Sequence, residues 1–147
     1  MIVITDSNII ISAIISEKSV ISNIILEENK IQFLAPSFII EEIKKHQQKI
    51  ILISKISSKQ FKTRFELLLS KIKIIDVDAI PKIHKTKALE IVKDIDFDDF
   101  FFVALYLYKK HKIWTGDKVL IKGLKSKGLD ICITTTELKN SIYKKKN

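Results

Sequence analysis

Short, β-branched apolar runs alternate with longer segments of helical spacing along almost the whole chain. The runs lie at residues 2–5, 31–34, 72–75, 113–115 and 131–133, and each is followed by a segment whose apolar residues recur every three or four positions. Strands that alternate with helices form parallel sheets, because a helix carries the chain back to the start of the next strand. The sequence therefore predicts an α/β fold: a three-layer α/β/α sandwich around a mainly parallel central sheet of about five short strands.

Helix boundaries follow from capping residues and prolines. Ser57 with Gln60, and Thr134 with Glu137, have the spacing of a capping box, in which each side chain accepts a backbone N–H of the other residue. Pro36 suits the first turn of a helix, where its missing N–H costs nothing. The expected helices cover residues 8–15, 19–28, 37–53, 57–70, 81–93, 99–110 and 118–127, with a last helix after 134. In the helix at 81–93, the side chains expected to face the core are Ile83, Leu89, Ile91 and Val92.

The length and charge of the chain limit its class. Its 147 residues fit one domain, expected over residues 1–143, with a basic C-terminal tail at 144–147. Lys and Arg number 26 against 17 Asp and Glu, so the net charge of +9 attracts polyanions such as RNA or DNA. AT-rich coding also enriches a chain in Ile and Lys, so the charge alone does not decide between these explanations.

The location of the chain is predicted from its cysteine and its apolar runs. Cys132 is the only cysteine, so no intramolecular disulfide forms and a reducing cytoplasm is expected. The apolar stretch before Asp6 is too short for a signal peptide. The longest apolar run, at 100–108, is far shorter than the roughly 20 residues that span a bilayer. We therefore expect a cytoplasmic protein without a membrane partner.

Four carboxylates lie where strands should end and helices begin. Asp6 and Asp117 each close a predicted strand, and the carboxyl ends of parallel strands share one edge of the sheet. Glu42 and Asp99 lie on helical segments, beside apolar residues. Acidic side chains that gather in one place repel each other unless a positive charge joins them, and hard divalent cations such as Mg²⁺ or Mn²⁺ prefer oxygen ligands. The pattern predicts metal-dependent chemistry on a phosphodiester.

Each acid also has a simpler explanation. An Asp at a strand-to-helix junction commonly caps the helix, which applies to Asp6 and Asp117. Glu42 resembles many exposed helical glutamates. The acidic stretch from Asp96 to Asp99 is also what the dipole of the following helix favours in its first turn.

In their order along the chain, four segments resemble the motifs of the PIN-domain nucleases. They are Ile4-Thr5-Asp6-Ser7-Asn8-Ile9-Ile10, Pro36-Ser37-Phe38-Ile39-Ile40-Glu41-Glu42-Ile43, Asp96-Phe97-Asp98-Asp99-Phe100-Phe101-Phe102-Val103-Ala104-Leu105 and Trp114-Thr115-Gly116-Asp117-Lys118. The resemblance covers essentially the whole chain and implies a PIN-like nuclease domain over residues 1–143. Many members carry a further acid or hydroxyl after the fourth motif, where this chain has Val119-Leu120-Ile121, so the number of metal ions stays open.

The resemblance implies an activity, a site and partners. The activity is divalent-metal-dependent cleavage of RNA, and small members of this kind are often the toxins of bacterial type II toxin–antitoxin pairs (VapC-like). A homodimer and a cognate antitoxin are therefore expected, together with Mg²⁺ or Mn²⁺. The implied catalytic and metal-binding residues are Asp6, Glu42, Asp99 and Asp117, with Asp96 as a helper. Ser7, Asn8 and Thr115 would shape the site by hydrogen bonds.

Basic residues near these motifs are candidates for phosphate contacts. They are Lys44, Lys45, Lys118, Lys122 and Lys125, although each is equally explained as part of a solvated helix face. The three histidines, His46, His84 and His111, are scattered without zinc-ligand spacing and are assigned to the surface or its boundary.

Two other functions fit parts of the pattern. A catalytically silent PIN-like module would bind RNA or protein without cutting. A signalling receiver domain has a similar small α/β fold, and Asp76 would be its phosphate acceptor.

Overall fold

The core of the protein is a parallel β-sheet. The computed structural model describes the backbone of residues 1–146 and the side chains of residues 1–143, so the side chains of the predicted tail at 144–147 lie outside the described part. Within that part the sheet has five strands in the order β3-β2-β1-β4-β5, and all pairings are parallel. The strands are β1 (Ile2–Thr5), β2 (Gln32–Pro36), β3 (Ile72–Ile75), β4 (Ile113–Trp114) and β5 (Cys132–Ile133). This confirms the predicted fold class.

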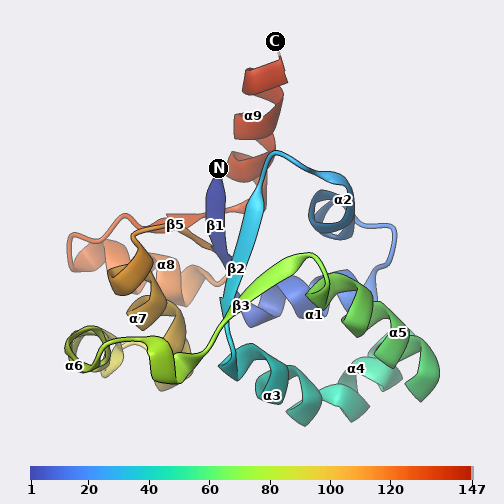
Figure 1. Cartoon of the computed structure of the whole chain (residues 1–147), viewed down its shortest axis with the longest axis horizontal. Coiled ribbons are helices and arrows are strands. Elements are labelled where there is room, and N and C mark those ends of the chain that lie inside the picture. Colours follow the sequence, from blue (N-terminus) through green and yellow to red (C-terminus); the bar gives the residue numbers. More distant parts are fainter. Residues whose placement is uncertain (147) are drawn as a thin grey trace.

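Helices cover both faces of the sheet (Figure 1). Their bounds are α1 Ser7–Ile15, α2 Val20–Glu27, α3 Phe38–Lys45, α4 Gln47–Ser54, α5 Ser58–Leu69, α6 Lys82–Val92, α7 Phe100–Lys109, α8 Lys118–Ser126 and α9 Thr135–Lys146. Two short 3₁₀ turns, η1 (Val77–Ala79) and η2 (Phe97–Asp99), precede α6 and α7. Figure 1 shows α6, α7 and α8 on one side of the sheet and α1 to α5 on the other.

Alternating strand residues build two cores, one on each face of the sheet. Val3 and Trp114 pack with residues of α1, α3 and α5, whereas Ile4 and Ile113 pack with residues of α6, α7 and α8. Successive side chains of a strand point to opposite faces, so every strand serves both cores. Helices therefore pack on both faces of the sheet, which confirms the predicted three-layer α/β/α arrangement.

The strand order changes direction at β1. The chain moves from β1 to β2 and β3 on one side, and then returns to place β4 and β5 on the other side. At such a switch point the connections leave in opposite directions and open a crevice beyond the carboxyl ends of the two strands. The crevice lies beyond β1 and β4, which are the strands followed by Asp6 and Asp117.

The predicted uninterrupted helix at 37–53 is wrong. The chain instead forms α3 and α4, which meet at His46 (φ −97°, ψ 9°), where the His46 N–H bonds back to the carbonyls of Ile43 and Lys44. Pro36 is the last residue of β2 and pairs with Ile75, so it does not open the helix. Both capping boxes form as predicted, at Ser57 with Gln60 and at Thr134 with Glu137.

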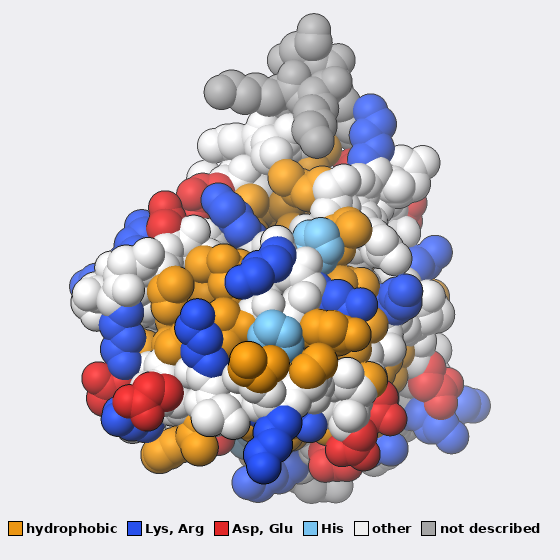
Figure 2. Space-filling view, turned by 60° about the vertical axis from the view of Figure 1, so that its left-hand side comes forward, with side chains coloured by type: hydrophobic (Ala, Val, Ile, Leu, Met, Phe, Trp, Pro, Cys, Tyr) orange, Lys and Arg blue, Asp and Glu red, His pale blue; other side chains and the backbone are white. Residues whose placement is uncertain are grey.

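The apolar set predicted for α6 is only partly buried. Val92 is buried, but the side chains of Ile83 and Leu89 are 73% and 47% exposed, and Ala88 takes the inner position instead. The molecular face on the α6 side, seen in Figure 2, mixes hydrophobic patches with lysine or arginine and histidine side chains, and its acidic side chains lie mainly toward the edges of the view. The apolar periodicity predicted the helix correctly, but it did not predict which side of the helix packs against the core.

The described residues contain no single helix that is long and apolar enough to cross a membrane. Helices α1 and α2 reach the required length only as a pair, across a bend of 105°.

Gly128, which follows α8, provides a test of the backbone assignment. Its φ is +77°, and a Cβ there would meet no atom within 4 Å, so the conformation alone disfavours a side chain. We expect Gly128→Ala to lower the free energy of unfolding by about 1 kcal/mol. Gly116→Ala is the matched control, because Gly116 has equal space and no positive φ, and it should change stability by less than about 0.5 kcal/mol. Equal stabilities of the two variants in urea unfolding would contradict the assignment.

Candidate active site

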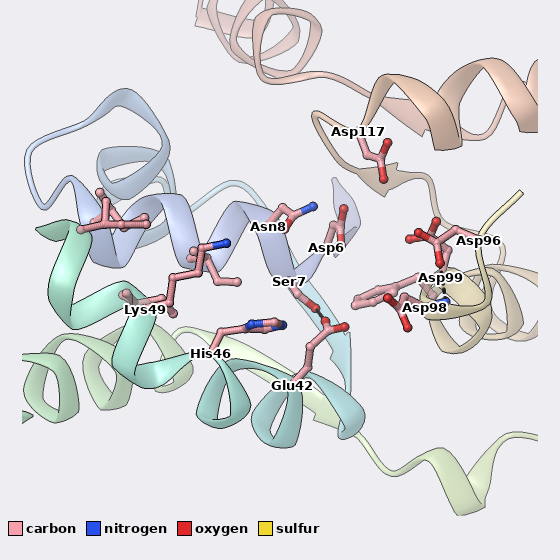
Figure 3. Close-up of a pocket in the computed structure, with 15 residues that line it drawn as sticks. Asp6, Ser7, Asn8, Glu42, His46, Lys49, Asp96, Asp98, Asp99 and Asp117 are labelled. Carbon is pink, nitrogen blue, oxygen red and sulfur yellow. Dashed lines mark hydrogen bonds between the residues drawn. The ribbon is translucent and has the colours of Figure 1, made fainter.

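Six carboxylates line one cavity at the switch point of the sheet. The cavity has a volume of about 280 Å³, and its acids come from four separate parts of the chain. Figure 3 shows Glu42 on α3 at one side, Asp6 in the middle, Asp117 above, and Asp96, Asp98 and Asp99 together on the far side. The lining acids are Asp6, Glu42, Asp96, Asp98, Asp99 and Asp117. All four acids singled out in the sequence therefore share one cavity, together with the helper Asp96.

Asp6 is buried directly after β1. Its side chain makes no well-formed capping hydrogen bond to α1, although the nearby backbone N–H of Asn8 lowers its pKa, so capping is a minor role for this residue. Instead its Oδ2 accepts a hydrogen bond of 2.6 Å from the Thr115 hydroxyl, which follows β4. The pKa of Asp6 is raised to about 6: burial is the largest cause, the nearby Glu42 and Asp117 also raise it, and the bond from Thr115 opposes the rise.

Asp99 is the most strongly perturbed acid of the cavity. It is 6% exposed, and its Oδ2 is buried without a hydrogen-bond partner. Its pKa is raised to about 8, chiefly by burial and in addition by the neighbouring carboxylates of Asp6, Asp117, Asp96 and Asp98. A buried polar atom without a partner is rare in native proteins and usually indicates a missing ligand, ion or water. Asp99 is therefore the residue in this cavity that most needs a positive partner.

Glu42 and Asp96 are each held by a neighbour. Glu42 is half-buried on α3, and its Oε1 accepts a short hydrogen bond from the Ser7 hydroxyl at the start of α1. Burial raises the pKa of Glu42, and the bond from Ser7 opposes that rise. Asp96 is exposed, and its Oδ1 accepts the backbone N–H of Asp98 at 2.9 Å, which caps η2.

Asp117 does cap a helix. Its Oδ1 accepts the backbone N–H groups of Val119 and Leu120 at 3.0 and 3.2 Å, at the start of α8. Its own N–H donates to the Thr115 hydroxyl oxygen at 3.0 Å. Thr115 therefore links Asp6 and Asp117 across the paired ends of β1 and β4. For Asp117 the capping role and a place in the cavity coexist.

The donor set of this cavity fits a hard divalent cation. Among the described side chains, no group of three or more His, Cys, Asp or Glu is arranged so that it could hold a metal ion. The cavity nevertheless brings six carboxylates, which are oxygen ligands, to one place. One buried oxygen among them, Asp99 Oδ2, has no hydrogen-bond partner. Carboxylate oxygens are the ligands that Mg²⁺ and Mn²⁺ prefer, and repulsion keeps such groups apart until a cation joins them.

Several side chains differ from the sequence-based site. Ser7 and Asn8 line the cavity, but none of the candidate phosphate-binding lysines does: Lys44, Lys45, Lys118, Lys122 and Lys125. His46, assigned to the surface or its boundary, is exposed as predicted and also lines the cavity, as do Lys49 and Asp98. His46 and Lys49 stand three positions apart at the start of α4, which is the signal that places both on one side of that helix, and the sequence reasoning did not use it.

Comparison with known proteins agrees with this geometry. The family model described as PIN domain matches residues 4–139, and the chain therefore belongs to the PIN-domain family. The family is one of nucleases, so the fold and site define a nuclease-type domain. No sequence among the curated proteins matches the chain.

Among solved structures, one chain in the crystal structure of VapBC2 from Rickettsia felis bound to a DNA fragment from their promoter is similar. The TM-score is 0.66 at 17% identity, and the alignment covers 91% of this chain and 97% of that chain. At this identity the similarity concerns the fold. The receiver alternative is excluded by the family match and by the strand order, because receiver sheets run 2-1-3-4-5. Asp76 caps η1 and does not line the cavity.

The raised pKa values predict how stability changes with pH. Asp6 and Asp99 have folded-state pKa values of about 6 and about 8, both above the ordinary value of 3.8. At a pH between the ordinary pKa and the raised folded-state pKa of each group, the folded state binds more protons than the unfolded state. Metal-free stability should therefore fall as pH rises from about 4 to about 8. Asp99→Asn removes the larger of the two contributions to this pH dependence. At pH 8 the variant should exceed the wild type by at least about 1 kcal/mol in free energy of unfolding, and at pH 4 the two should agree.

Excess Mn²⁺ should reverse this order at pH 8. Ligand binding to the folded state raises stability, by about 2.7 kcal/mol at a hundredfold excess over Kd, and the wild type should gain more than Asp99→Asn. Thermal unfolding with EDTA and with Mn²⁺ measures both effects. A wild type that is most stable at pH 8 without metal, or equal gains for both proteins, would contradict the electrostatic account.

Proposed function

We propose that this PIN-domain protein is a divalent-metal-dependent endoribonuclease. The observation that carries the proposal is the cavity in which Asp6 and Asp99 are buried among four further carboxylates, with Asp99 Oδ2 lacking any partner. A chain of net charge +9 that gathers six of its 17 acids in one hollow is suited to a polyanionic substrate cut at a metal centre.

The residues that would hold Mg²⁺ or Mn²⁺ are Asp6, Glu42, Asp99 and Asp117, with Asp96 at the edge. A bound divalent cation lowers the pKa of a coordinated water and offsets the charge that develops on the phosphate. The protein supplies no nucleophilic side chain in this scheme, since the described cavity lining contains no cysteine and its one hydroxyl, on Ser7, donates to Glu42.

Supporting hydrogen bonds keep the carboxylates in place. Thr115 fixes one oxygen of Asp6, and Ser7 fixes one oxygen of Glu42, which leaves the other oxygen of each available. Such supporting bonds orient metal ligands and affect affinity or activity strongly when removed. Ser7 and Thr115 therefore act as positioning residues in the proposed site, and Asn8 lies beside them at the start of α1.

Cleavage of labelled single-stranded RNA tests the proposal. The wild type should cut in Mn²⁺ or Mg²⁺ and stop in EDTA, and Asp6→Asn should lower the rate by at least about 100-fold, because ligand loss removes several kcal/mol of transition-state stabilisation. Asp78→Asn is the control, since this exposed acid has the same charge change outside the cavity. Metal-independent RNA binding without cleavage of any RNA tested would favour the catalytically silent RNA-binding module.

We further propose that the nuclease is the toxin of a bacterial toxin–antitoxin pair, acts in the cytoplasm and forms a homodimer. The support is the family and the shared fold with a chain of the VapBC2 structure. A short neighbouring reading frame encoding a DNA-binding protein, whose product co-purifies with this chain and stops its RNA cleavage, is the expected result. Light scattering of the purified chain measures the dimer. Expression without growth arrest in a bacterial host would contradict the toxin assignment and leave the nuclease assignment standing.

A further inference from the structure

The active-site cavity has two unlike walls. One wall carries the carboxylates, and the other is formed by α1 and α4 and carries no acid. The second wall consists of Ile11 and Ile15 from α1 together with His46, Lys49, Ile50 and Ile53 from the start and body of α4. Figure 3 shows His46 and Lys49 on the side of the cavity away from Asp96, Asp98 and Asp99. The cavity therefore has an acidic side and, opposite it, a side that presents the Lys49 ammonium group and apolar side chains.

The break between α3 and α4 is part of this wall. His46, Lys49, Ile50 and Ile53 are spaced i, i+3, i+4 and i+7, so they form one side of a helical surface. Ile50 is buried and fixes α4 against the core that contains α1, whereas Ile53 is 54% exposed. The side chains around this anchor therefore stay accessible from the cavity.

Lys49 is a cation without a fixed partner. Within the described residues it takes part in no hydrogen bond, salt bridge or cation–π contact, although six carboxylates line the same cavity. An exposed lysine beside an acidic site, yet not paired with it, is free to bind an anion that arrives with the substrate. Its apolar neighbours Ile15 and Ile53 offer no hydrogen-bonding group that would distinguish one base from another.

We propose that the α1–α4 wall binds the nucleotide next to the scissile phosphate of a single-stranded RNA. In this arrangement Lys49, with His46 beside it, contacts the phosphate of that nucleotide, and Ile15 and Ile53 contact its base or ribose. This inference rests on the proposed nuclease function. A cavity of about 280 Å³ is comparable in size to one nucleotide, and a nucleotide can enter it only where the strand is single or locally open, so single-stranded RNA is the proposed ligand.

Two substitutions separate the charge from the apolar contact. Lys49→Gln should raise both the Kd for RNA and the KM of cleavage about five- to tenfold, leave kcat unchanged within about twofold, and reduce the slope of log Kd against log salt by about 0.7. Ile53→Ser should weaken binding without changing that slope, because no phosphate contact is lost. Lys49→Arg should restore the wild-type values.

Each test position has a control of the same chemistry outside the cavity. Lys62→Gln makes the same charge change on α5, outside the cavity, and Leu52→Ser changes a neighbouring side chain of α4 that is 79% exposed and does not line the cavity. Both controls should bind as the wild type does. Thermal unfolding of all variants checks that each one is folded.

Binding is measured by fluorescence anisotropy in EDTA with a labelled single-stranded RNA of about eight nucleotides, a length within the usual site sizes of about 4–16. Cleavage of the same RNA is followed in Mn²⁺. If Lys49→Gln equals the wild type in Kd, KM and salt slope while Asp6→Asn abolishes cleavage, the subsite is overturned and the nuclease stands. If the wild type binds in a Lys49-dependent way but never cleaves, the contact of Lys49 with RNA stands, whereas the nuclease and the placement beside a scissile phosphate both fail. A wild type that does not bind the RNA overturns the subsite.

Discussion

Repulsion among carboxylates at one edge of the sheet is the constraint on which the rest of this site depends. Asp6 and Asp99 are buried, and four more acids line the same cavity. Removing an ionised carboxylate from water is expensive, so a metal-free site relieves the charge by holding protons, which is what raised pKa values near 6 and 8 mean. A divalent cation would replace those protons and would give Asp99 Oδ2 the partner that it lacks.

The scaffold is built to hold these acids together against that repulsion. Parallel pairing of β1 with β4 at the switch point brings the ends of the two strands together, and the Thr115 hydroxyl bonds to Asp6 while it accepts the N–H of Asp117. Two apolar cores, one on each face, fix the strands so that the carboxylates cannot move apart without disturbing the packing. Stability that comes from the cores is therefore used to maintain an unfavourable concentration of charge.

Much of this arrangement follows from local rules in the sequence, and the rest depends on long-range packing. The β-branched runs, the two capping boxes and the order of strands and helices predict the sheet, and parallel strands then require Asp6 and Asp117 to share an edge. The break at His46 was missed because both halves keep the same apolar spacing. The exposed position of Ile83 was missed because apolar periodicity along a helix does not show which of its sides packs against another part of the protein. Lysine positions were equally uninformative: Lys49 lines the cavity and Lys45 does not, although both lie on helical segments.

Diffraction from crystals soaked in Mn²⁺, collected at a wavelength where manganese scatters anomalously, tests the central claim most directly. The account predicts an anomalous peak in the cavity within bonding distance of carboxylate oxygens of Asp6 and Asp99, about 2.0–2.2 Å for a hard cation, and loss of that peak in Asp99→Asn. A cavity without a peak at saturating Mn²⁺, or a peak held only by acids outside it, would contradict the claim that these buried carboxylates are brought together to bind a metal.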